Sequence, residues 1–343
     1  MKIKKDDKFI DFSMRGAGDY LNSLTDFAAL LGSIEEADKA AKELLEETQK
    51  TDSIAPDAPK TKAEQEPERP SLEELLKQLD ELVGLEKIKA NVKSLINLMK
   101  VRKLREENGL VVPPVSLHMV FMGNPGTGKT TVARLLAGLY CAIGVLSKGQ
   151  LVEVDRSGLV AGYVGQTAQK TSEVIKKALG GVLFIDEAYA LTSKEGNDFG
   201  QEAVETLLKA MEDNRDDLVV IVAGYEDLME EFIRSNPGLE SRFNRYFIFE
   251  DYTAEELFAI FMSQCNKNMY VLGEGAEEKA KEFFKSLYEL RDENFGNGRD
   301  VRNFFENVIA AHSDRVSQME APTKDDLMNI LPEDLEKAEL MES

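Results

Sequence analysis

A glycine-rich stretch, GNPGTGKTT (residues 123–131), limits more than any other feature what this chain can fold into. It matches the pattern G-x-x-x-x-G-K-[ST], which begins at Gly123 and ends with Gly128, Lys129 and Thr130. In that pattern glycines let backbone N–H groups surround phosphate oxygens, the lysine reaches the β- and γ-phosphates, and the threonine hydroxyl ligates Mg²⁺. The apolar run LHMVFMG precedes the stretch and the helical pattern TVARLLAGLY follows it. This strand, loop and helix context predicts a site for ATP and Mg²⁺.

We expect the whole stretch to surround the nucleotide, with Lys129 also acting in catalysis and Thr130 ligating the metal. The residues are Gly123, Asn124, Pro125, Gly126, Thr127, Gly128, Lys129, Thr130 and Thr131.

Two acids follow a second apolar run, in GGVLFIDEAYAL. Taken alone, Asp186 and Glu187 could simply mark the exit of a buried strand into solvent. Beside a phosphate-binding loop, their position suits a metal-side carboxylate, Asp186, and a base, Glu187, that orients and deprotonates the attacking water. We therefore expect the pair to form the second half of an ATP site.

Five short apolar runs alternate with helical segments between residues 71 and 251, and they end in MG, VD, ID, AG and ED. Such alternation predicts an α/β domain with a five-stranded parallel sheet and helices on both faces. After Asp251 the pattern is helical throughout, so residues 252–343 are expected to form a separate all-α domain.

The first 70 residues differ in composition from the rest. Helical spacing of apolar residues from Asp19 to Lys50, interrupted near Gly32 and Ser33, predicts an acidic helical extension over residues 1–50. Residues 51–70 are rich in Pro, Lys and Glu and are expected to be a flexible linker.

Charge and hydropathy exclude several functions. The formal net charge of -21 disfavours nucleic acid as a partner, and the basic cluster KVRKLREE contains glutamates of its own, which fits a solvated helix face. No apolar run approaches the ~20 residues of a membrane helix, and the start MKIKKDDKFI does not have the pattern of a signal peptide, so we expect a cytoplasmic protein.

Two cysteines and two histidines are too few for a metal site or for protease-type catalysis. Cys141 and Cys265 lie far apart and read as packing residues. His118 falls in an apolar run and His312 lies on a late helix without companions, so neither a metal site nor a Ser-His-Asp arrangement is expected.

From about Leu79 to Arg302 the chain resembles the AAA+ ATPases, and within them the CbbX/SpoVK (CfxQ) branch, which contains red-type Rubisco activase and a sporulation protein. The resemblance rests on LVGLEKIK, GNPGTGKTTVARL, GYVGQTAQKT, VLFIDEAYAL, FGQEAVETLLKAMEDNRDDLVVIVAGY, NPGLESRF and FGNGRDVRN. It implies an α/β domain with a helical lid, ATP bound between the two, and assembly into a hexameric ring.

The resemblance assigns roles to arginines. Arg242, in GLESRFNRY, falls where the family carries an arginine finger that reaches the γ-phosphate held by the neighbouring subunit, with Arg245 as the rival position. Arg299, in GNGRDVR, resembles the sensor-2 arginine at the start of a lid helix, with Arg302 as its rival.

Three further positions follow from the same resemblance. Val83 and Gly84 would contact adenine, although an ordinary helix-entry turn would look alike. Tyr225, in IVAGYEDL, stands at or near the place where many AAA+ proteins carry a polar sensor-1 residue, often Asn. This departure leaves open how the water is polarised.

The segment AGYVGQTA follows the second strand, on the connection that AAA+ motors point into the central pore. Without that context, Tyr163 would read as an exposed turn residue. With it, Tyr163 is predicted to grip an extended peptide, while Gly162 and Gly165, on either side of Tyr163 and Val164, let the loop bend. The later segment TSKEGNDFG fits a second pore loop or any surface loop.

The sequence thus favours an ATP-hydrolysing ring motor that pulls on a protein client. The alternative is an ATP-dependent assembly switch or scaffold that recruits partners without threading. A DNA-linked, clamp-loader-like ATPase is disfavoured by the charge. The sequence does not identify the client.

Overall fold

The computed structural model describes residues 2–5, 8–11, 70–163, 165–192, 199–292 and 295–342. The chain divides into two compact units, Met1–Glu68 and Arg69–Ser343. In the first unit, strands β1 (Lys2–Lys5) and β2 (Lys8–Asp11) pair antiparallel, with Ile3 opposite Ile10. The extension expected over residues 1–50 thus begins with a pair of short strands, ahead of the stretch from Asp19 in which helices are expected. The helices expected over 19–50 and all but the last residue of the linker expected over 51–70 lie outside the described residues.

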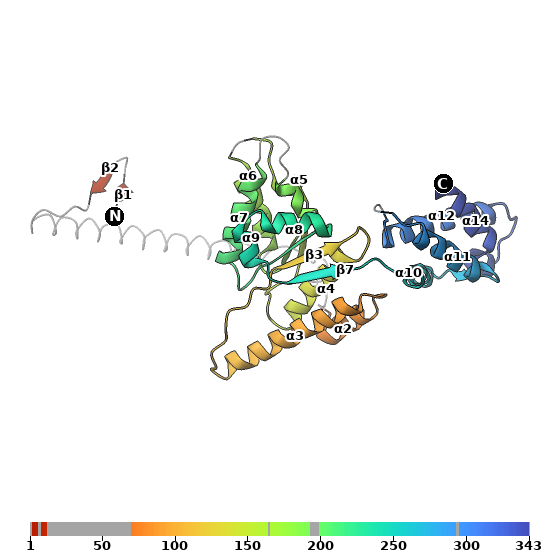
Figure 1. Cartoon of the computed structure of the whole chain (residues 1–343), viewed down its shortest axis with the longest axis horizontal. Coiled ribbons are helices and arrows are strands. Elements are labelled where there is room, and N and C mark those ends of the chain that lie inside the picture. Colours follow the sequence, from red (N-terminus) through yellow and green to blue (C-terminus); the bar gives the residue numbers. More distant parts are fainter. Residues whose placement is uncertain are drawn as a thin grey trace, which may run out of the picture. The chain divides into compact units, whose positions relative to one another are not determined.

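A five-stranded parallel sheet lies among helices α2 to α9 of the second unit (Figure 1). The strands are β3 (Met119–Gly123), β4 (Leu151–Val154), β5 (Val182–Ile185), β6 (Val219–Gly224) and β7 (Tyr246–Phe249), and their order is β4-β5-β6-β3-β7. Each of them coincides with one of the five apolar runs, so the predicted sheet is confirmed. The phosphate-loop strand β3 lies between β6 and β7.

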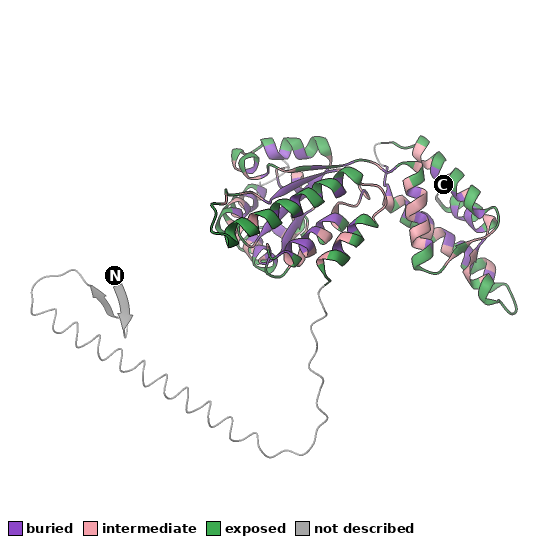
Figure 2. Ribbon diagram, turned by 90° about the horizontal axis from the view of Figure 1, so that it is seen from below, coloured by how far each residue is buried: buried purple, intermediate pink, exposed green. Residues whose placement is uncertain are grey.

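Helices cover both faces of the sheet (Figure 1). Alternation along β3 explains this, since Met119 and Phe121 belong to one core and Val120 and Met122 to the other. The first core is closed by α2 (Leu72–Asp80), α3 (Glu86–Glu107) and α4 (Lys129–Ala142). The second is closed by α5 (Arg156–Leu159), α6 (Thr167–Ala178), η1 (Ala188–Thr192), α7 (Gly200–Asp213), α8 (Glu226–Arg234) and α9 (Pro237–Arg242). Figure 2 shows buried residues on the strands and on the inner sides of these helices.

After β7 the chain forms a helical lid with a core of its own. Its helices are α10 (Ala254–Lys267), α11 (Ala276–Glu289), α12 (Gly298–Ser317), α13 (Lys324–Met328) and α14 (Pro332–Glu342). Phe261, Phe284 and Phe304 are fully buried in its core, with ring centroids 5.5 to 5.7 Å apart. The lid also contains a short parallel pair, β8 (Val271–Leu272) and β9 (Asn329–Ile330), so the all-helical prediction missed two extended segments too short to leave a pattern.

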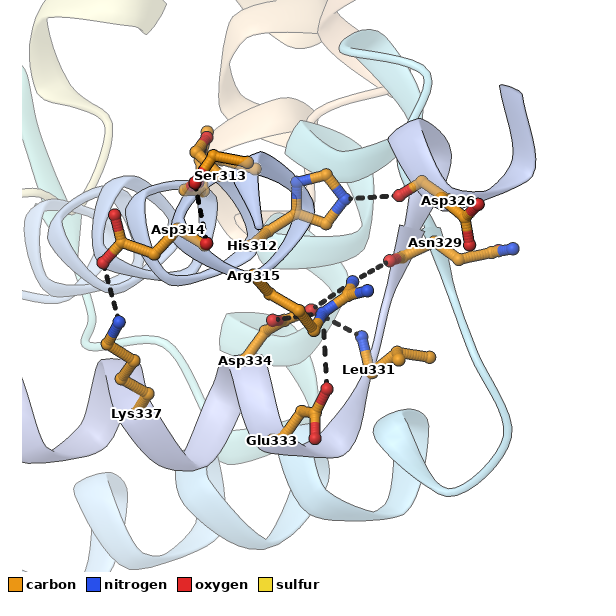
Figure 3. A network of polar contacts seen from close by, with 12 residues as sticks. His312, Ser313, Asp314, Arg315, Asp326, Asn329, Leu331, Glu333, Asp334 and Lys337 are labelled. Carbon is orange, nitrogen blue, oxygen red and sulfur yellow. Dashed lines mark hydrogen bonds and ion pairs between the residues drawn. The ribbon is translucent and has the colours of Figure 1, made fainter. Parts of the chain in front are cut away.

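A polar network holds the last helix of the lid in place (Figure 3). Arg315 on α12 donates from Nε and Nη2 to the two carboxylate oxygens of the buried Asp334, at 2.9 Å each, and from Nη2 to the Asn329 carbonyl. His312, also buried, lies 3.0 Å from the Asp326 carbonyl oxygen and packs edge-on against Tyr270. His312 therefore packs within the lid.

Candidate functional site: a nucleotide cavity at the strand ends

The carboxyl ends of β3, β5 and β6 meet at one edge of the sheet, because all neighbouring strands are parallel. In register, Met122 stands beside Gly224 and Ile185 beside Val222. The glycine-rich loop leaves β3 at this edge, the two acids follow β5, and Tyr225 follows β6. Ligands of open α/β sheets bind at such an edge.

A cavity of about 460 Å³ lies there. From the predicted site it is lined by Val83, Gly123, Pro125, Gly126, Gly128, Lys129, Thr130, Thr131, Asp186, Glu187, Tyr225, Arg299 and Arg302. The loop, the acid pair and the lid arginines, which the sequence treats as separate motifs, therefore share one cavity.

The loop backbone has the conformation that a phosphate cradle needs. Gly123, Gly126 and Gly128 have φ values of 146°, 73° and 94°, which disfavour residues with a Cβ. A Cβ at Gly126 would overlap the Gly296 carbonyl oxygen. Helix α4 begins directly after the loop, at Lys129, so the N–H groups of its first turn point to the cavity end without carbonyl partners in the helix. These groups fit an anionic phosphate.

Lys129 lies among oxygen atoms at the floor of the loop. Its Nζ donates to the carbonyl oxygens of Gly123 and Asn124, at 2.8 Å each. Burial lowers the pKa of Lys129 from 10.5 to about 8, against the opposing effect of the nearby carboxylates, of which Asp186 has the largest. A half-buried ammonium whose hydrogen bonds to described residues go to two carbonyls is a suitable partner for phosphate oxygens.

The acid pair faces the same cavity from β5. Asp186 is half-buried and its N–H donates to the Val154 carbonyl at 2.8 Å, whereas Glu187 is exposed and has a positive φ of 49°. Thr130 and Asp186 together offer a hydroxyl and a carboxylate, the oxygen ligands that Mg²⁺ prefers. The residues present therefore fit a Mg²⁺ ion.

The four arginines separate into two groups. Arg299 and Arg302 both line the cavity from α12, so the geometry does not choose between them. Arg242 and Arg245 are not among the residues that line it. Nη2 of Arg242 lies 3.4 Å from the Glu212 carboxylate, and its buried Nε has no hydrogen-bond partner among the described residues, while Nε of Arg245 donates to the Ser116 carbonyl.

Three residues predicted to contact the nucleotide contact other parts of the protein instead. Gly84, with φ 59°, packs so closely against Glu256 of the lid that a Cβ would overlap its carboxylate. Thr127 is fully buried and donates to the Asn124 carbonyl at 2.8 Å. Asn124 itself donates from Nδ2 to both Asp251 oxygens, at 2.9 and 3.1 Å. Each of these three residues shapes the loop or a contact with the lid.

Sequence reasoning missed Asp251, Tyr252 and Asn297, which join the loop to the lid. The Tyr252 hydroxyl donates to the Thr127 carbonyl at 3.2 Å, and Asn297 donates to Asp251 at 2.7 Å. Asp251 ends the last apolar run, and Asn297 stands between two glycines in FGNGRD. An asparagine in such a position, where a positive φ is common, was the available signal.

The predicted pore loop follows α5 and leads into α6. Tyr163 is 74% exposed, Gly165 has a φ of 78°, and a Cβ at Gly162 or Gly165 would meet no atom within 4 Å. Val164 lies outside the described residues. A second cavity is lined by Gly162 and by Glu187, so the base of this loop and the candidate catalytic acid face the same cavity.

The histidine of the first apolar run, His118, contacts strand β6. His118 is buried, accepts a hydrogen bond from the Val220 N–H at 3.0 Å, and has its pKa lowered to about 4 by burial. Within the described ranges, no group of three or more His, Cys, Asp and Glu residues could hold a metal ion. The helices described also include none long and apolar enough to cross a membrane.

Comparison with known proteins gives two family matches. The family described as "ATPase family associated with various cellular activities (AAA)" matches residues 119–251, and the AAA lid domain matches residues 253–343. Among solved structures, the chain resembles the FIGL-1 AAA domain, with a TM-score of 0.53, 17% identity and coverage of 77% of this chain and 82% of that one. A RuvB mutant of Thermotoga maritima gives a TM-score of 0.51 at 21% identity, covering 77% of this chain and 72% of the other. These two likenesses support the fold.

Curated relatives are much closer in sequence. Stage V sporulation protein K of Bacillus subtilis is 44% identical over 265 residues, which cover 77% of this chain and 82% of the relative. CbbX of Cereibacter sphaeroides is 45% identical over 245 residues, covering 71% and 79%. The chloroplastic ribulose bisphosphate carboxylase/oxygenase activase of Cyanidioschyzon merolae is 42% identical over 275 residues, covering 79% and 93%. The chain is therefore an ATPase of the AAA family and belongs to the branch that includes stage V sporulation protein K and the CfxQ and CbbX proteins.

Proposed function

We propose that this ATPase is a Mg²⁺-dependent motor that assembles into a hexameric ring and remodels a protein client by pulling on a polypeptide segment. The observation that carries the proposal is the meeting of Lys129, Thr130, Asp186 and Glu187 at one cavity, although they come from the ends of two separate strands. Such a set binds a triphosphate and supplies a base for water at the same place.

Each residue has a role that follows from its position. Lys129 binds the β- and γ-phosphate oxygens. Its ammonium gives up its hydrogen bonds to the Gly123 and Asn124 carbonyls when it does so. Thr130 and Asp186 hold Mg²⁺, which when bound neutralises phosphate charge. Glu187, the more exposed acid, orients the attacking water and accepts its proton.

Arg242 acts in the site of a neighbouring subunit. It does not line the cavity of its own chain, and its contact with the exposed Glu212 is a surface ion pair of the kind that contributes little. Its other hydrogen bonds, from Nη1 to the Gly238 carbonyl at 3.4 Å and to the Ser241 hydroxyl at 3.5 Å, are long, so the guanidinium can exchange them for a γ-phosphate across an interface. This role requires a ring or another closed assembly, since each site then takes its arginine from the next subunit.

Arg299 acts on the nucleotide of its own chain. It lies in the first turn of α12, lines the cavity, and helps to lower the pKa of Lys129. A lid that carries this cation at its entry responds to the charge of the nucleotide. Arg302, one turn further along α12, is the alternative for the same role.

Tyr163 is the gripping residue. Its exposed ring has space around it, and the loop that carries it adjoins Glu187 through the second cavity. A movement of the catalytic acid during hydrolysis can therefore reach the base of the loop through this cavity. An aromatic side chain binds extended peptides with little regard to sequence, which suits a motor with varied clients. The client is a protein, and we do not propose Rubisco on the basis of the relatives' names.

The experiment measures ATPase activity with and without reduced, carboxymethylated casein as an unfolded polypeptide. In a threading motor, casein changes the rate of the wild type, this response is lost in Tyr163→Ala, and it is kept in Tyr163→Phe, which retains an aromatic ring. If all three proteins respond equally, or none responds, the protein is an assembly switch or scaffold and threading is refuted.

A further inference from the structure

A single carboxylate joins the phosphate loop to the lid. Asp251, at the end of the α/β domain, accepts from Asn124 Nδ2 with both oxygens, at 2.9 and 3.1 Å. The same Oδ1 accepts from Asn297 Nδ2 at 2.7 Å. Asn297 precedes α12 directly, so Asp251 is bonded at once to the loop that binds phosphate and to the helix that carries Arg299.

Asn124 also connects Asp251 to Lys129. Its carbonyl oxygen accepts from Lys129 Nζ and from the Thr127 hydroxyl, at 2.8 Å each. Hydrogen bonds therefore connect Lys129 to the backbone of Asn124, and the side chain of Asn124 to Asp251 and on to Asn297; we name these four residues the relay. When Lys129 turns toward a phosphate, it releases the carbonyl of the residue whose side chain holds Asp251.

The lid rests on the loop through backbone atoms as well. The Gly298 N–H donates to the Gly126 carbonyl at 3.2 Å, and a Cβ on Gly298 would lie 2.8 Å from that oxygen. No side chain separates the two segments at this point. A displacement of the loop is therefore passed on to the start of α12 without being absorbed by flexible side chains.

Asn297 is held in a strained conformation by the hydrogen bonds of its side chain. Its φ of 54° and ψ of -121° lie outside the regions that residues with a Cβ favour, and it is fully buried. Such a conformation persists where surrounding bonds over-determine it. Those bonds are the donation to Asp251 and the hydrogen bond that the Asn297 Oδ1 accepts from the Tyr252 N–H at 2.9 Å.

We propose that Asp251 is a positioning residue that couples occupancy of the phosphate loop to the orientation of the lid, through Asn124 on one side and Asn297 on the other. When the loop moves on binding nucleotide, the start of α12 moves with it, and this movement sets the positions of Arg299 and Arg302 at the cavity. This inference rests on the proposed function, since it requires nucleotide to bind at the loop.

The test is amide hydrogen exchange of full-length protein, with and without ADP, in two segments: the loop (residues 123–131) and α12 (residues 298–317). In the wild type, ADP slows exchange in both. In Asp251→Ala, ADP still slows exchange in the loop. In α12 the factor by which ADP slows exchange falls roughly ten- to hundred-fold, the range expected for the loss of hydrogen bonds to a charged group. The matched control is Glu250→Ala, which removes the neighbouring carboxylate, bonded at 2.6 Å to Lys87 on α3 and to no residue of the relay.

A second variant separates coupling from stability. Asn297→Gly removes the amide but relaxes the positive φ, so it should lose the α12 response while its melting temperature without nucleotide changes little. The proposal is overturned if Asp251→Ala and Asn297→Gly keep the full ADP response in α12, or if Glu250→Ala loses it equally. If ADP fails to slow exchange even in the wild-type loop, nucleotide binding at this cavity is wrong, and the proposed function falls together with the coupling.

Discussion

Raising the pH above 8 should weaken nucleotide binding, because Lys129 then loses its charge. Burial lowers the pKa of this ammonium from 10.5 to about 8, and the nearby Arg299 lowers it too, whereas Asp186, Asp251 and Glu187 raise it. Phosphate oxygens bind the protonated form. Below pH 8 most of the protein is therefore ready to bind, and above it the protein must first take up a proton.

The size of the effect follows from the pKa of the free protein. About half of the lysine is charged at pH 8 and about a tenth at pH 9, so affinity for ADP should fall about fivefold between pH 8 and pH 9, and about tenfold for each further pH unit. An ordinary exposed lysine, with a pKa near 10.4, would give an almost flat profile over the same range.

Fluorescent ADP titrated at pH 7.0 to 9.5 measures this directly. The last ionisation of a phosphate group lies near pH ~6, so the ligand does not change charge in the window. Lys129→Arg is the control, because a guanidinium stays charged throughout and should give a flat profile even if its affinity is lower. A flat wild-type profile, or an equal decline in the arginine variant, would refute the assignment of the low pKa to Lys129.

Two other changes test the site and its contact with the lid. Glu187→Gln should keep nucleotide binding but reduce phosphate release by about 10²- to 10⁴-fold, because the base for water is lost while the charged lysine remains; an unchanged rate would exclude Glu187 as the base. Gly126→Ala should lower stability by about 1–3 kcal/mol, since its Cβ would overlap the Gly296 carbonyl at a positive φ, whereas Gly162→Ala, in open space, should stay within about 0.5 kcal/mol in chemical denaturation. Equal stability of the two variants would contradict the close contact between loop and lid.

Most of the fold could be predicted from local patterns of apolar and polar residues. Each of the five strands is an apolar run next to a helical segment, and the order of motifs placed the loop and the acids at the same edge once the strands were taken as parallel. The loop at 123–131 was predictable because its chemistry depends on residues adjacent in sequence. Short extended pairs such as β8 and β9 were missed because two residues show no period.

Contacts between distant segments could not be predicted. Asn124, Asp251 and Asn297 come from the first strand end, the last strand end and the entry of α12, and each alone reads as a turn or strand-end residue. Asn124 was expected at the nucleotide, yet its side chain holds Asp251. The choice between Arg299 and Arg302 also stayed open, because both lie on the same side of α12 and line the cavity.

The most direct test of the central claim measures ATPase rate per subunit against protein concentration, with assembly followed by light scattering in ATP. A ring motor with Arg242 acting across the interface predicts a rate that climbs with concentration as large assemblies form, and loss of that rate in Arg242→Ala. Arg215→Ala is the matched control, since Arg215 also pairs with Glu212, at 3.6 Å, and should behave as wild type. A rate that is flat with concentration and unaffected by Arg242→Ala would contradict the ring and the motor together.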